Sequence, residues 1–354
     1  MDQSDLKEKL PGYIATGLLI ITTTLWTLWG AYQMYYQSWG SGFPPWWLNM
    51  VPAFISLGLS LFAITRPRAG GWLLIIIGGL IAVWWSIMAG GRARMMFSWI
   101  ITTLPVIITL VITGIFLLLE SRYLDRQRRL GRRSQGIWFK RNGRYILAVG
   151  LPLLIFLIVS VYYLPKVMQR VDDGSREARL IQGNGVKLVW APQGPGWNWK
   201  QPDGWYPSWS RVALYGVQPV GFEVKPGYEE KYPDESDMAA KGLCSYLSQD
   251  GTTLMELPQY IWRLPTTDEI VRSLVKHGEN AGCTWNWEPG KAECEVIPDK
   301  ETPLWAPDVS PIYYWASDEF DHLNAWYLSY DGAVHFQPKE WSNLQHSYRC
   351  VREP

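Results

Sequence analysis

The sequence predicts a multi-span α-helical membrane domain with five transmembrane helices, followed by an extracytoplasmic domain of mixed α/β structure. Long apolar stretches are confined to residues 1–165. The same residues carry 15 Lys and Arg against 5 Asp and Glu, whereas residues 166–354 carry 18 against 27. All 4 cysteines lie in the second part. The net charge of +1 therefore conceals two regions of opposite charge.

Five stretches within the membrane domain (residues 1–165) are long and apolar enough to cross a bilayer. A hydrocarbon core about 30 Å thick takes roughly 20 helical residues. No stretch has an Asp, Glu, Lys, Arg or His in its interior; they cover residues 14–35, 47–65, 72–89, 98–119 and 145–164. The first is not expected to be a cleaved signal peptide, because its apolar run is too long and no small-x-small site follows.

The distribution of basic residues predicts the orientation. With the N-terminus in the cytoplasm, the inside segments contain two basic residues before the first span, two between the second and third, and nine in residues 122–144. The outside loop 37–46 contains none, and residues 90–97 contain two. This asymmetry follows the positive-inside rule. We therefore expect a multi-pass protein of the plasma (inner) membrane whose N-terminus is cytoplasmic and whose C-terminal domain is periplasmic or extracellular.

The basic loop 120–144 is the only sizeable feature predicted on the cytoplasmic side. Juxtamembrane Lys and Arg clusters attract anionic lipid headgroups by about 1 kcal/mol per residue. We expect headgroup contacts from five arginines of this loop: Arg126, Arg128, Arg129, Arg132 and Arg133. An acidic cytoplasmic partner is the alternative. Nucleic acid is not expected, because no recognition fold accompanies the basic run.

The predicted spans lack the side chains that transport or membrane redox chemistry would use. Ion and proton pathways usually need ionisable groups within the membrane, and haem ligation would most simply use a membrane His. Small residues such as Gly78, Gly79 and Ala82 permit close helix packing, within this chain or against another. Two roles therefore stay open for the spans, a self-contained anchor and a docking surface for partner membrane subunits.

The second half is expected to begin with a polar linker over residues 166–185, followed by the extracytoplasmic domain over residues 186–354. Val186–Pro192 is predicted as its first strand. Residues 193–236 are crowded with Gly, Pro and aromatic side chains, which disfavours regular structure. Their Trp and Tyr side chains must either pack within an ordered loop or form a contact surface.

Two helices and a hairpin follow in the sequence. Residues 240–247 place Ala240, Leu243, Cys244 and Leu247 on one helical face. A second helix is predicted to begin after Thr266, which with Glu269 forms a capping box. Its buried stripe is Ile270 and Leu274, and Lys276, His277 and Gly278 supply a basic last turn and a glycine stop. Asp331–Gly332 predicts a tight turn between two strands, and Ser347–Arg352 a final strand.

The four cysteines form an even set without C-x-x-C spacing, in the part predicted to face an oxidising space. This favours disulfide bonds over a zinc site.

A set of ordered motifs in this half carries a family resemblance. The motifs are Trp262, Arg263, Leu264, Pro265 and Thr266 with Asp268 and Glu269, then Tyr314–Trp315, Ala325–Trp326 and Arg349–Arg352. Residues 186–354 thereby resemble the Lcl-type C-terminal domain, a family similar in fold to C-type lectins and formylglycine-generating enzymes. The resemblance implies a C-type-lectin-like fold with two helices around small antiparallel sheets. It also implies the disulfide pairs Cys244–Cys350 and Cys283–Cys294.

The resemblance implies binding rather than catalysis, because some family members are implicated in binding glycans. Two disulfides would also consume the thiols that a formylglycine-generating enzyme needs, so no catalytic residue is expected. The candidate binding surface consists of aromatic residues, namely Trp197, Trp199, Trp205, Tyr206, Trp209, Trp285 and Trp287. The ligand is expected to be a glycan, another surface ligand or a protein. The alternative role is an accessory subunit of a larger membrane protein complex.

No cofactor or metal is expected, with calcium as the one candidate. The four histidines have no metal-ligand spacing. Asp318, Glu319 and Asp321 form a carboxylate cluster that suits Ca²⁺, which prefers oxygen ligands, although a solvated acidic loop is the simpler alternative. The tripeptide Gln201–Asp203 imitates a lectin sugar-binding motif, but it precedes the first helix and is interpreted as a coincidence.

Overall fold

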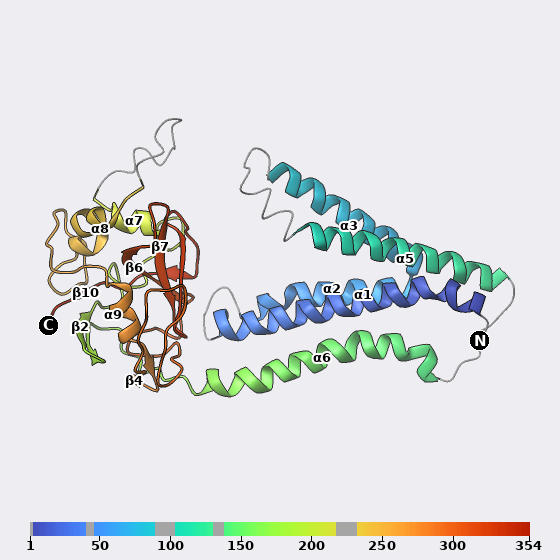
Figure 1. Ribbon diagram of the computed structural model, residues 1–354, viewed down its shortest axis with the longest axis horizontal. Coiled ribbons are helices and arrows are strands. Elements are labelled where there is room, and N and C mark those ends of the chain that lie inside the picture. Colours follow the sequence, from blue (N-terminus) through green and yellow to red (C-terminus); the bar gives the residue numbers. More distant parts are fainter. Residues whose placement is uncertain (1–2, 40–45, 89–102, 130–137, 217–231) are drawn as a thin grey trace. The chain divides into compact units, whose positions relative to one another are not determined.

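The structure is a computed structural model that describes residues 3–39, 46–88, 103–129, 138–216 and 232–354 (Figure 1). The chain divides into two compact units. The first contains Met1–Tyr35 and Trp47–Leu164, and the second contains Tyr36–Trp46 and Pro165–Pro354. The short segment that follows the first long helix therefore belongs to the unit formed by the C-terminal half.

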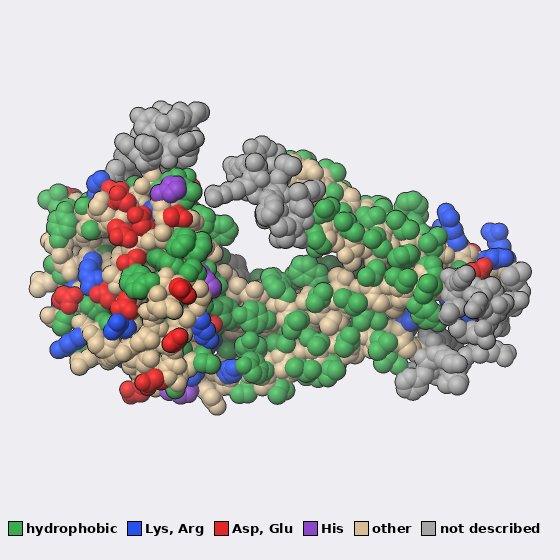
Figure 2. Space-filling model, viewed as in Figure 1, with side chains coloured by type: hydrophobic (Ala, Val, Ile, Leu, Met, Phe, Trp, Pro, Cys, Tyr) green, Lys and Arg blue, Asp and Glu red, His purple; other side chains and the backbone are tan. Residues whose placement is uncertain are grey.

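The first unit is built from long helices. In the described part of the chain the α-helices are α1 (Gln3–Gln33), α2 (Val51–Thr65), α3 (Pro67–Met88), α5 (Leu104–Arg129) and α6 (Trp138–Met168). A π-helical turn (Met34–Ser38) continues α1, and a 3₁₀ turn (Trp46–Met50) precedes α2. Among the described residues, five helices are long and apolar enough to cross a membrane, as the prediction of five apolar helices requires. Figure 2 shows hydrophobic side chains over most of the visible surface of these helices, as contact with lipid requires.

The helix boundaries differ from the expected ones because a helix does not end where its apolar run ends. The third candidate span begins at Pro67 rather than at residue 72, and the fourth continues to Arg129 rather than ending at residue 119. Residues 89 and 98–102 of the expected spans lie outside the described residues. The polar end of α5 stays helical, and Arg126, Arg128 and Arg129 in its last turn complement the helix dipole.

Glycines bring α3 and α5 together. A Cβ atom on Gly71 would lie 2.8 Å from the carbonyl oxygen of Gly114, and one on Gly114 would lie 2.6 Å from that of Gly71. Elsewhere in this unit, Thr23 of α1 shares a hydrogen bond of 2.9 Å with Ser60 of α2. Small residues and hydroxyl pairs are the usual means of close helix packing in membranes.

The described residues of the second unit form a mixed α/β domain with three small sheets. The first has the order β1 (Arg179–Gly183), β2 (Val186–Trp190), β10 (Val351–Arg352), and the second pairs β3 (Val275–Lys276) with β4 (Glu279–Asn280). The third has the order β5 (Gly290–Lys291), β8 (Ala333–Pro338), β7 (Asn324–Ser329), β6 (Tyr313–Glu319), β9 (His346–Ser347). All pairs are antiparallel except β6 with β9.

The predicted linker 166–185 contains a strand, which corrects that prediction. Arg179 pairs with Trp190 and Gly183 with Val186, so β1 and β2 form a hairpin with a two-residue loop. Asn184 and Gly185 occupy the loop with φ values of 48° and 78°. Asn-Gly is the preferred sequence for such a turn, so these two residues were the feature of the sequence from which the hairpin could have been predicted. The expected first strand at Val186 is confirmed as β2, and the expected Asp331–Gly332 turn does connect β7 to β8.

The helices of this unit are shorter than predicted: α7 (Trp209–Ala213), α8 (Glu235–Lys241), a 3₁₀ turn (Leu243–Tyr246) and α9 (Thr267–Arg272). Gly242 separates the expected helix face into α8 and the 3₁₀ turn, because its backbone is extended with ψ 149°. Helix α9 ends at Arg272, and His277 and Gly278 instead form the turn of the β3–β4 hairpin with positive φ. The predicted single final strand is likewise two short strands, β9 and β10.

The capping box before α9 is present. The Thr266 hydroxyl accepts from the backbone N–H of Glu269 at 3.3 Å, and the Glu269 carboxylate accepts from the backbone N–H of Thr266 at 2.8 Å. Arg263 donates to both carboxylate oxygens of Glu269 at 2.7 and 2.6 Å. The backbone of Arg263 also exchanges two hydrogen bonds with Val351, at 2.9 and 2.8 Å. These residues therefore fix the start of α9 to the C-terminal strand.

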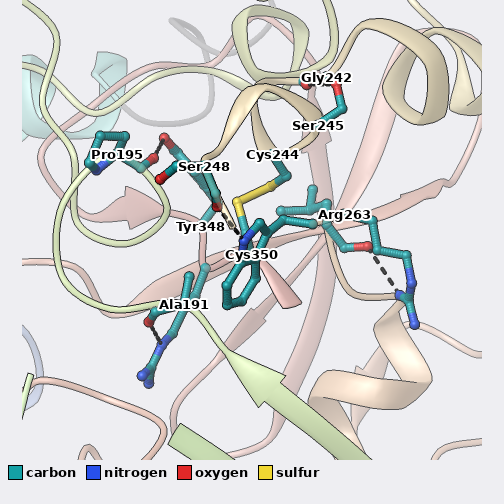
Figure 3. Close-up of a disulfide and its surroundings, with 12 residues drawn as sticks. Ala191, Pro195, Gly242, Cys244, Ser245, Ser248, Arg263, Tyr348 and Cys350 are labelled. Atoms are coloured by element: carbon teal, nitrogen blue, oxygen red, sulfur yellow. Dashed lines mark hydrogen bonds between the residues drawn. A yellow bond between two sulfur atoms is a disulfide. The ribbon is translucent and has the colours of Figure 1, made fainter. Parts of the chain in front are cut away.

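Both disulfide bonds that the resemblance implied are present, Cys244–Cys350 and Cys283–Cys294. Figure 3 shows the first of them with its surroundings. Next to Cys350, the Tyr348 hydroxyl donates to the carbonyl of Pro195 at 2.5 Å. The Cys244–Cys350 disulfide joins segments 106 residues apart and holds the C-terminal strand to the 3₁₀ turn Leu243–Tyr246. Disulfides in this half are compatible with an extracytoplasmic location.

The core of the second unit is rich in tryptophan. Six indoles are almost completely buried, namely Trp190, Trp197, Trp209, Trp262, Trp305 and Trp315. Arg349 is also fully buried, with its guanidinium 3.5 Å from the centre of the Trp197 ring. It donates to the carbonyls of Ala191, Pro303 and Leu304 at 3.0, 2.7 and 2.8 Å. Burial lowers the pKa of Arg349 to about 9. Much of the aromatic content of this half therefore serves packing.

Candidate functional site

A cleft in the second unit is the candidate site. Its volume is about 340 Å³, near the lower end of the roughly 300–1,000 Å³ typical of small-molecule sites. Four separate segments supply the lining, which consists of Gln37, Ser38, Trp205, Ser310, Trp341, Asn343, Leu344 and Gln345. Two large indoles and five polar uncharged side chains thus face one small space.

A tight turn presents Trp205. The backbone N–H of Gly204 donates to the carbonyl of Gln201 at 2.9 Å, and that of Gln201 donates to the carbonyl of Trp205 at 2.8 Å. The Asp203 carboxylate accepts from the backbone N–H of Trp205 at 3.0 Å. The tripeptide Gln201–Asp203 is therefore the framework of a turn, and it leaves the Trp205 side chain 44% exposed.

Trp341 is presented by the loop after β8. Its backbone N–H donates to the carbonyl of Pro338 at 2.8 Å, and its side chain is 49% exposed. The next residue, Ser342, donates its hydroxyl to the carbonyl of Tyr206 at 2.7 Å. The backbone N–H of Tyr206 in turn donates to the carbonyl of Asn343 at 3.3 Å. These two bonds tie the Trp341 loop to the Trp205 loop and thereby fix the spacing of the two loops.

Asn343 organises the polar part of the cleft. Its side-chain oxygen accepts from the backbone N–H groups of Gln345 and His346 at 2.7 and 2.9 Å, and its amide nitrogen lies 2.9 Å from His346 Nδ1. The Gln345 side chain donates to the Gln37 side-chain oxygen at 2.5 Å. The amide groups of the cleft are thus held by one another and by the backbone.

His346 supports this loop from the interior. Its ring lies 4.6, 5.0 and 4.7 Å from those of Tyr313, Trp315 and Tyr327. Burial lowers the pKa of His346 to about 3, so the ring is neutral at physiological pH. A neutral imidazole beside Asn343 keeps charge out of the polar side of the cleft.

The segment that contributes Gln37 is itself anchored in the second unit. The Tyr36 hydroxyl lies 2.7 Å from that of Ser329, and the Tyr330 hydroxyl donates to the carbonyl of Tyr36 at 2.9 Å. Gln37 and Ser38 are also the last residues of the first candidate span, Glu8–Ser38. The last two residues of a candidate span therefore line the cleft.

The predicted aromatic surface is not one surface. Trp205 lines the cleft, whereas Trp197, Tyr206 and Trp209 are at most 2% exposed and pack in the core. The expectation that these three form a binding surface is wrong, because neighbouring side chains cover them. Trp199 is half-buried and packs edge-on against Tyr215.

Trp285 and Trp287 belong to a separate aromatic group. Their rings lie 4.9 Å apart, and Trp285 packs edge-on against Trp326 at 5.0 Å. Trp326 in turn contacts Phe320 and Phe336, which stack on each other at 3.9 Å. We call Trp287, Phe320 and Phe336 the aromatic patch, since each is exposed, at 58%, 41% and 37%.

The three predicted calcium ligands are not assembled as a site. Asp318 accepts from the backbone N–H of Thr267, and Glu319 accepts from the Lys339 ammonium. Asp321 accepts from the backbone N–H groups of Leu323 and Asn324 at 2.7 and 2.8 Å. Within the described ranges, no group of three or more His, Cys, Asp or Glu side chains is placed to hold a metal ion. The cluster instead caps α9 and stabilises loops.

Sequence reasoning missed most of the cleft. Trp341, Asn343 and Gln345 lie in the segment Glu340–His346, whose single Trp among polar residues was a weak signal. Gln37 lies about 300 residues earlier in the chain, and no local pattern connects it to them.

Comparisons of the chain with protein-family models, with curated proteins and with solved structures each find no match.

Proposed function

We propose that this is a membrane-anchored binding protein whose second unit holds a neutral saccharide in the cleft between Trp205 and Trp341. The observation that carries the proposal is the composition of the lining, two half-exposed indoles with Asn, Gln and Ser side chains around them. The residues that line the cleft include no ionisable side chain.

The lining matches the two kinds of surface that a sugar ring presents. The C–H face of a pyranose is apolar and packs on an indole, while its hydroxyls donate and accept hydrogen bonds around the rim. The amides of Gln345 and Gln37 each contain donors and acceptors in one group, and the Asn343 amide nitrogen has a second N–H beyond the one directed at His346. Small-molecule sites commonly combine apolar aromatic walls with a few convergent polar groups. The volume of about 340 Å³ favours one or two sugar rings.

Preorganisation also supports binding. The two indole loops are joined by hydrogen bonds of 2.7 and 3.3 Å, and Asn343 is fixed by three bonds to neighbouring residues. Since ordering a loop on binding costs free energy, a cleft fixed in advance binds more tightly.

The sequence predictions point the same way. The resemblance of residues 186–354 to the Lcl-type domain implies a C-type-lectin-like fold and a family in which some members are implicated in glycan binding. The positive-inside rule with five spans predicts that the second unit lies in the periplasm or outside the cell, where saccharides of the envelope are available. Both remain part of the proposal.

The test is saccharide binding by the full chain in detergent, screened on a glycan array and measured by calorimetry on the best ligand. Trp341→Ala and Trp205→Ala should each weaken binding at least about 10-fold, because truncating a central aromatic side chain of a binding site costs about 2 kcal/mol or more and about 1.4 kcal/mol is tenfold. Trp287→Ala is the matched control, since it removes an indole outside the cleft that is at least as exposed as the two in it. Absence of any saccharide ligand, or an equal loss in the control, would contradict the proposal.

A second candidate function, an accessory subunit of a membrane complex, is favoured by the aromatic patch of Trp287, Phe320 and Phe336. Aromatic side chains are enriched at the centres of protein interfaces. The measurement is co-migration of other membrane proteins with the native protein on a blue-native gel. Replacing the three patch residues with Ser should abolish co-migration, whereas Trp341→Ala should leave it intact.

A further inference from the structure

The first unit contains a basic pocket that the proposed function does not use. Its volume is about 500 Å³. It is formed by the α2–α3 connection and the end of α5, with the lining residues Thr65, Arg66, Pro67, Arg68, Ala69, Trp72, Ser121, Leu124, Asp125 and Arg128. Three arginines and one carboxylate thus share one opening.

Close helix packing builds the pocket. Arg66 is the one residue between α2 and α3, and a Cβ atom on Gly70 would lie 2.5 Å from the Cα atom of Ala63, so the two helices are folded tightly on each other. The Gly71–Gly114 contact then fixes the first turns of α3 against α5. This arrangement brings Arg66 and Arg68 to the same opening as Arg128, some 60 residues later in the chain.

The charges of the pocket are not balanced by the protein. Arg126 donates to Glu8 at 2.9 Å, and Arg144 donates to Glu120, so neighbouring arginines of the same unit have carboxylate partners. Within the described residues, no ion pair involves Arg66, Arg68 or Arg128. The pocket also lies at the N-terminus of α3, a helix of 22 residues, whose dipole favours an anion there.

We propose that this pocket binds the headgroup of an anionic phospholipid, with the phosphate held by Arg66, Arg68 and Arg128. The position at the ends of candidate spans favours a lipid over a free anion. Trp72 lines the pocket and is 56% exposed, as indoles at the membrane interface commonly are. The Asp125 carboxylate cannot face a phosphate favourably, but it can accept a hydrogen bond from a headgroup hydroxyl. The geometry therefore points to a headgroup that carries hydroxyls beyond its phosphate, such as glycerol.

This site refines the expected lipid contacts of the basic loop. Among the five predicted arginines, Arg128 lines the pocket, while Arg126 is paired with Glu8. Arg129 is exposed and does not line the pocket, and Arg132 and Arg133 lie outside the described residues.

The experiment is native mass spectrometry of the full chain in detergent, titrated with dioctanoyl phosphatidylglycerol, dioctanoyl phosphatidylcholine or inorganic phosphate. Phosphatidylglycerol should bind in one-to-one stoichiometry, with phosphatidylcholine at least about 10-fold weaker. The variant with Arg66→Gln, Arg68→Gln and Arg128→Gln should lose at least about 10-fold in affinity, since each arginine near the surface contributes about 1 kcal/mol. Arg122→Gln removes a charge from the same helix outside the pocket and should bind as the native protein does.

A gain of binding separates the proposal from misfolding. Asp125→Asn removes the negative charge from the pocket, so it should bind dioctanoyl phosphatidic acid, which lacks a headgroup hydroxyl, more tightly than the native chain does. Unchanged phosphatidylglycerol binding in the triple variant would overturn the assignment of the arginines. Displacement of the lipid by an equal concentration of inorganic phosphate would overturn the assignment to a lipid in favour of a free anion.

Discussion

Trp197 and Trp205 lie eight residues apart in the same aromatic segment, yet their environments are opposite. Trp197 is fully buried, donates its indole N–H to the Tyr314 hydroxyl at 2.6 Å and lies against the Arg349 guanidinium. Trp205 is 44% exposed and held outward by a turn. An aromatic-rich segment can therefore supply buried core residues and exposed rings at once. The neighbours brought from elsewhere in the chain decide which role each ring takes.

The largest expected effect comes from removing the buried cation beside Trp197. Arg349→Met keeps most of the side-chain volume but leaves the carbonyls of Ala191 and Pro303 without this donor. Because an unpaired buried polar group costs about 1–3 kcal/mol, we expect a loss of about 3 kcal/mol in the free energy of unfolding. Urea unfolding of the detergent-solubilised protein measures it. Arg211→Met, which removes an exposed guanidinium near Trp205, is the control and should change stability by about 0.5 kcal/mol or less.

The parts of the fold that the sequence predicted are those fixed by neighbouring residues. Thr266 and Glu269 lie three positions apart, so their capping box can be inferred from local spacing, and the Asp331–Gly332 turn likewise. The five apolar helices follow from composition over about 20 residues each. The Asn184–Gly185 hairpin had an equally local signal, which the polar flanking residues obscured.

The parts that it did not predict depend on contacts between distant segments. Trp197 and Trp205 share one local composition, and the first is buried by contacts with residues such as Arg349 and Tyr314, which lie over 100 positions away. The cleft forms only where Gln37 is hydrogen-bonded to Gln345 from a distant part of the chain. The basic pocket likewise combines Arg66 and Arg128, which belong to separate segments. No periodicity or spacing rule connects residues at such separations.

The buried His346, at the polar side of the cleft, should make the stability of the protein depend on pH. The pKa of His346 is lowered from 6.5 to about 3 by burial, so the folded protein holds it neutral while the unfolded chain takes up a proton below pH 6.5. The associated stability is complete above that pH and is lost as the pH falls toward 3. Between pH 7.5 and pH 5 we expect a loss of about 2 kcal/mol in the free energy of unfolding. His346→Gln should abolish this part of the pH dependence, and an unchanged slope would contradict the burial argument.

A third prediction concerns the hydrogen bond of the buried indole. Trp197→Phe retains an aromatic ring against Arg349 but removes the donor to the Tyr314 hydroxyl. Loss of one buried hydrogen bond and part of a ring should cost about 1–2 kcal/mol of stability. The saccharide affinity should stay within about twofold of the native value, since the cleft does not include this ring. Calorimetry and urea unfolding on the same preparation compare the two quantities.

The smallest expected effect on stability is that of replacing Trp341, an exposed indole, in contrast to the buried Trp197. Its side chain is 49% exposed, and the loop that carries it is held by backbone bonds of Trp341 and by Ser342 rather than by the indole. Trp341→Ala should therefore change the free energy of unfolding by about 0.5 kcal/mol or less while weakening saccharide binding. A large loss of stability would place Trp341 with Trp197 as a packing residue and remove one wall from the proposed site. Full stability with lost binding would show that the two roles of the aromatic residues are separable, because burial, not residue type, distinguishes them.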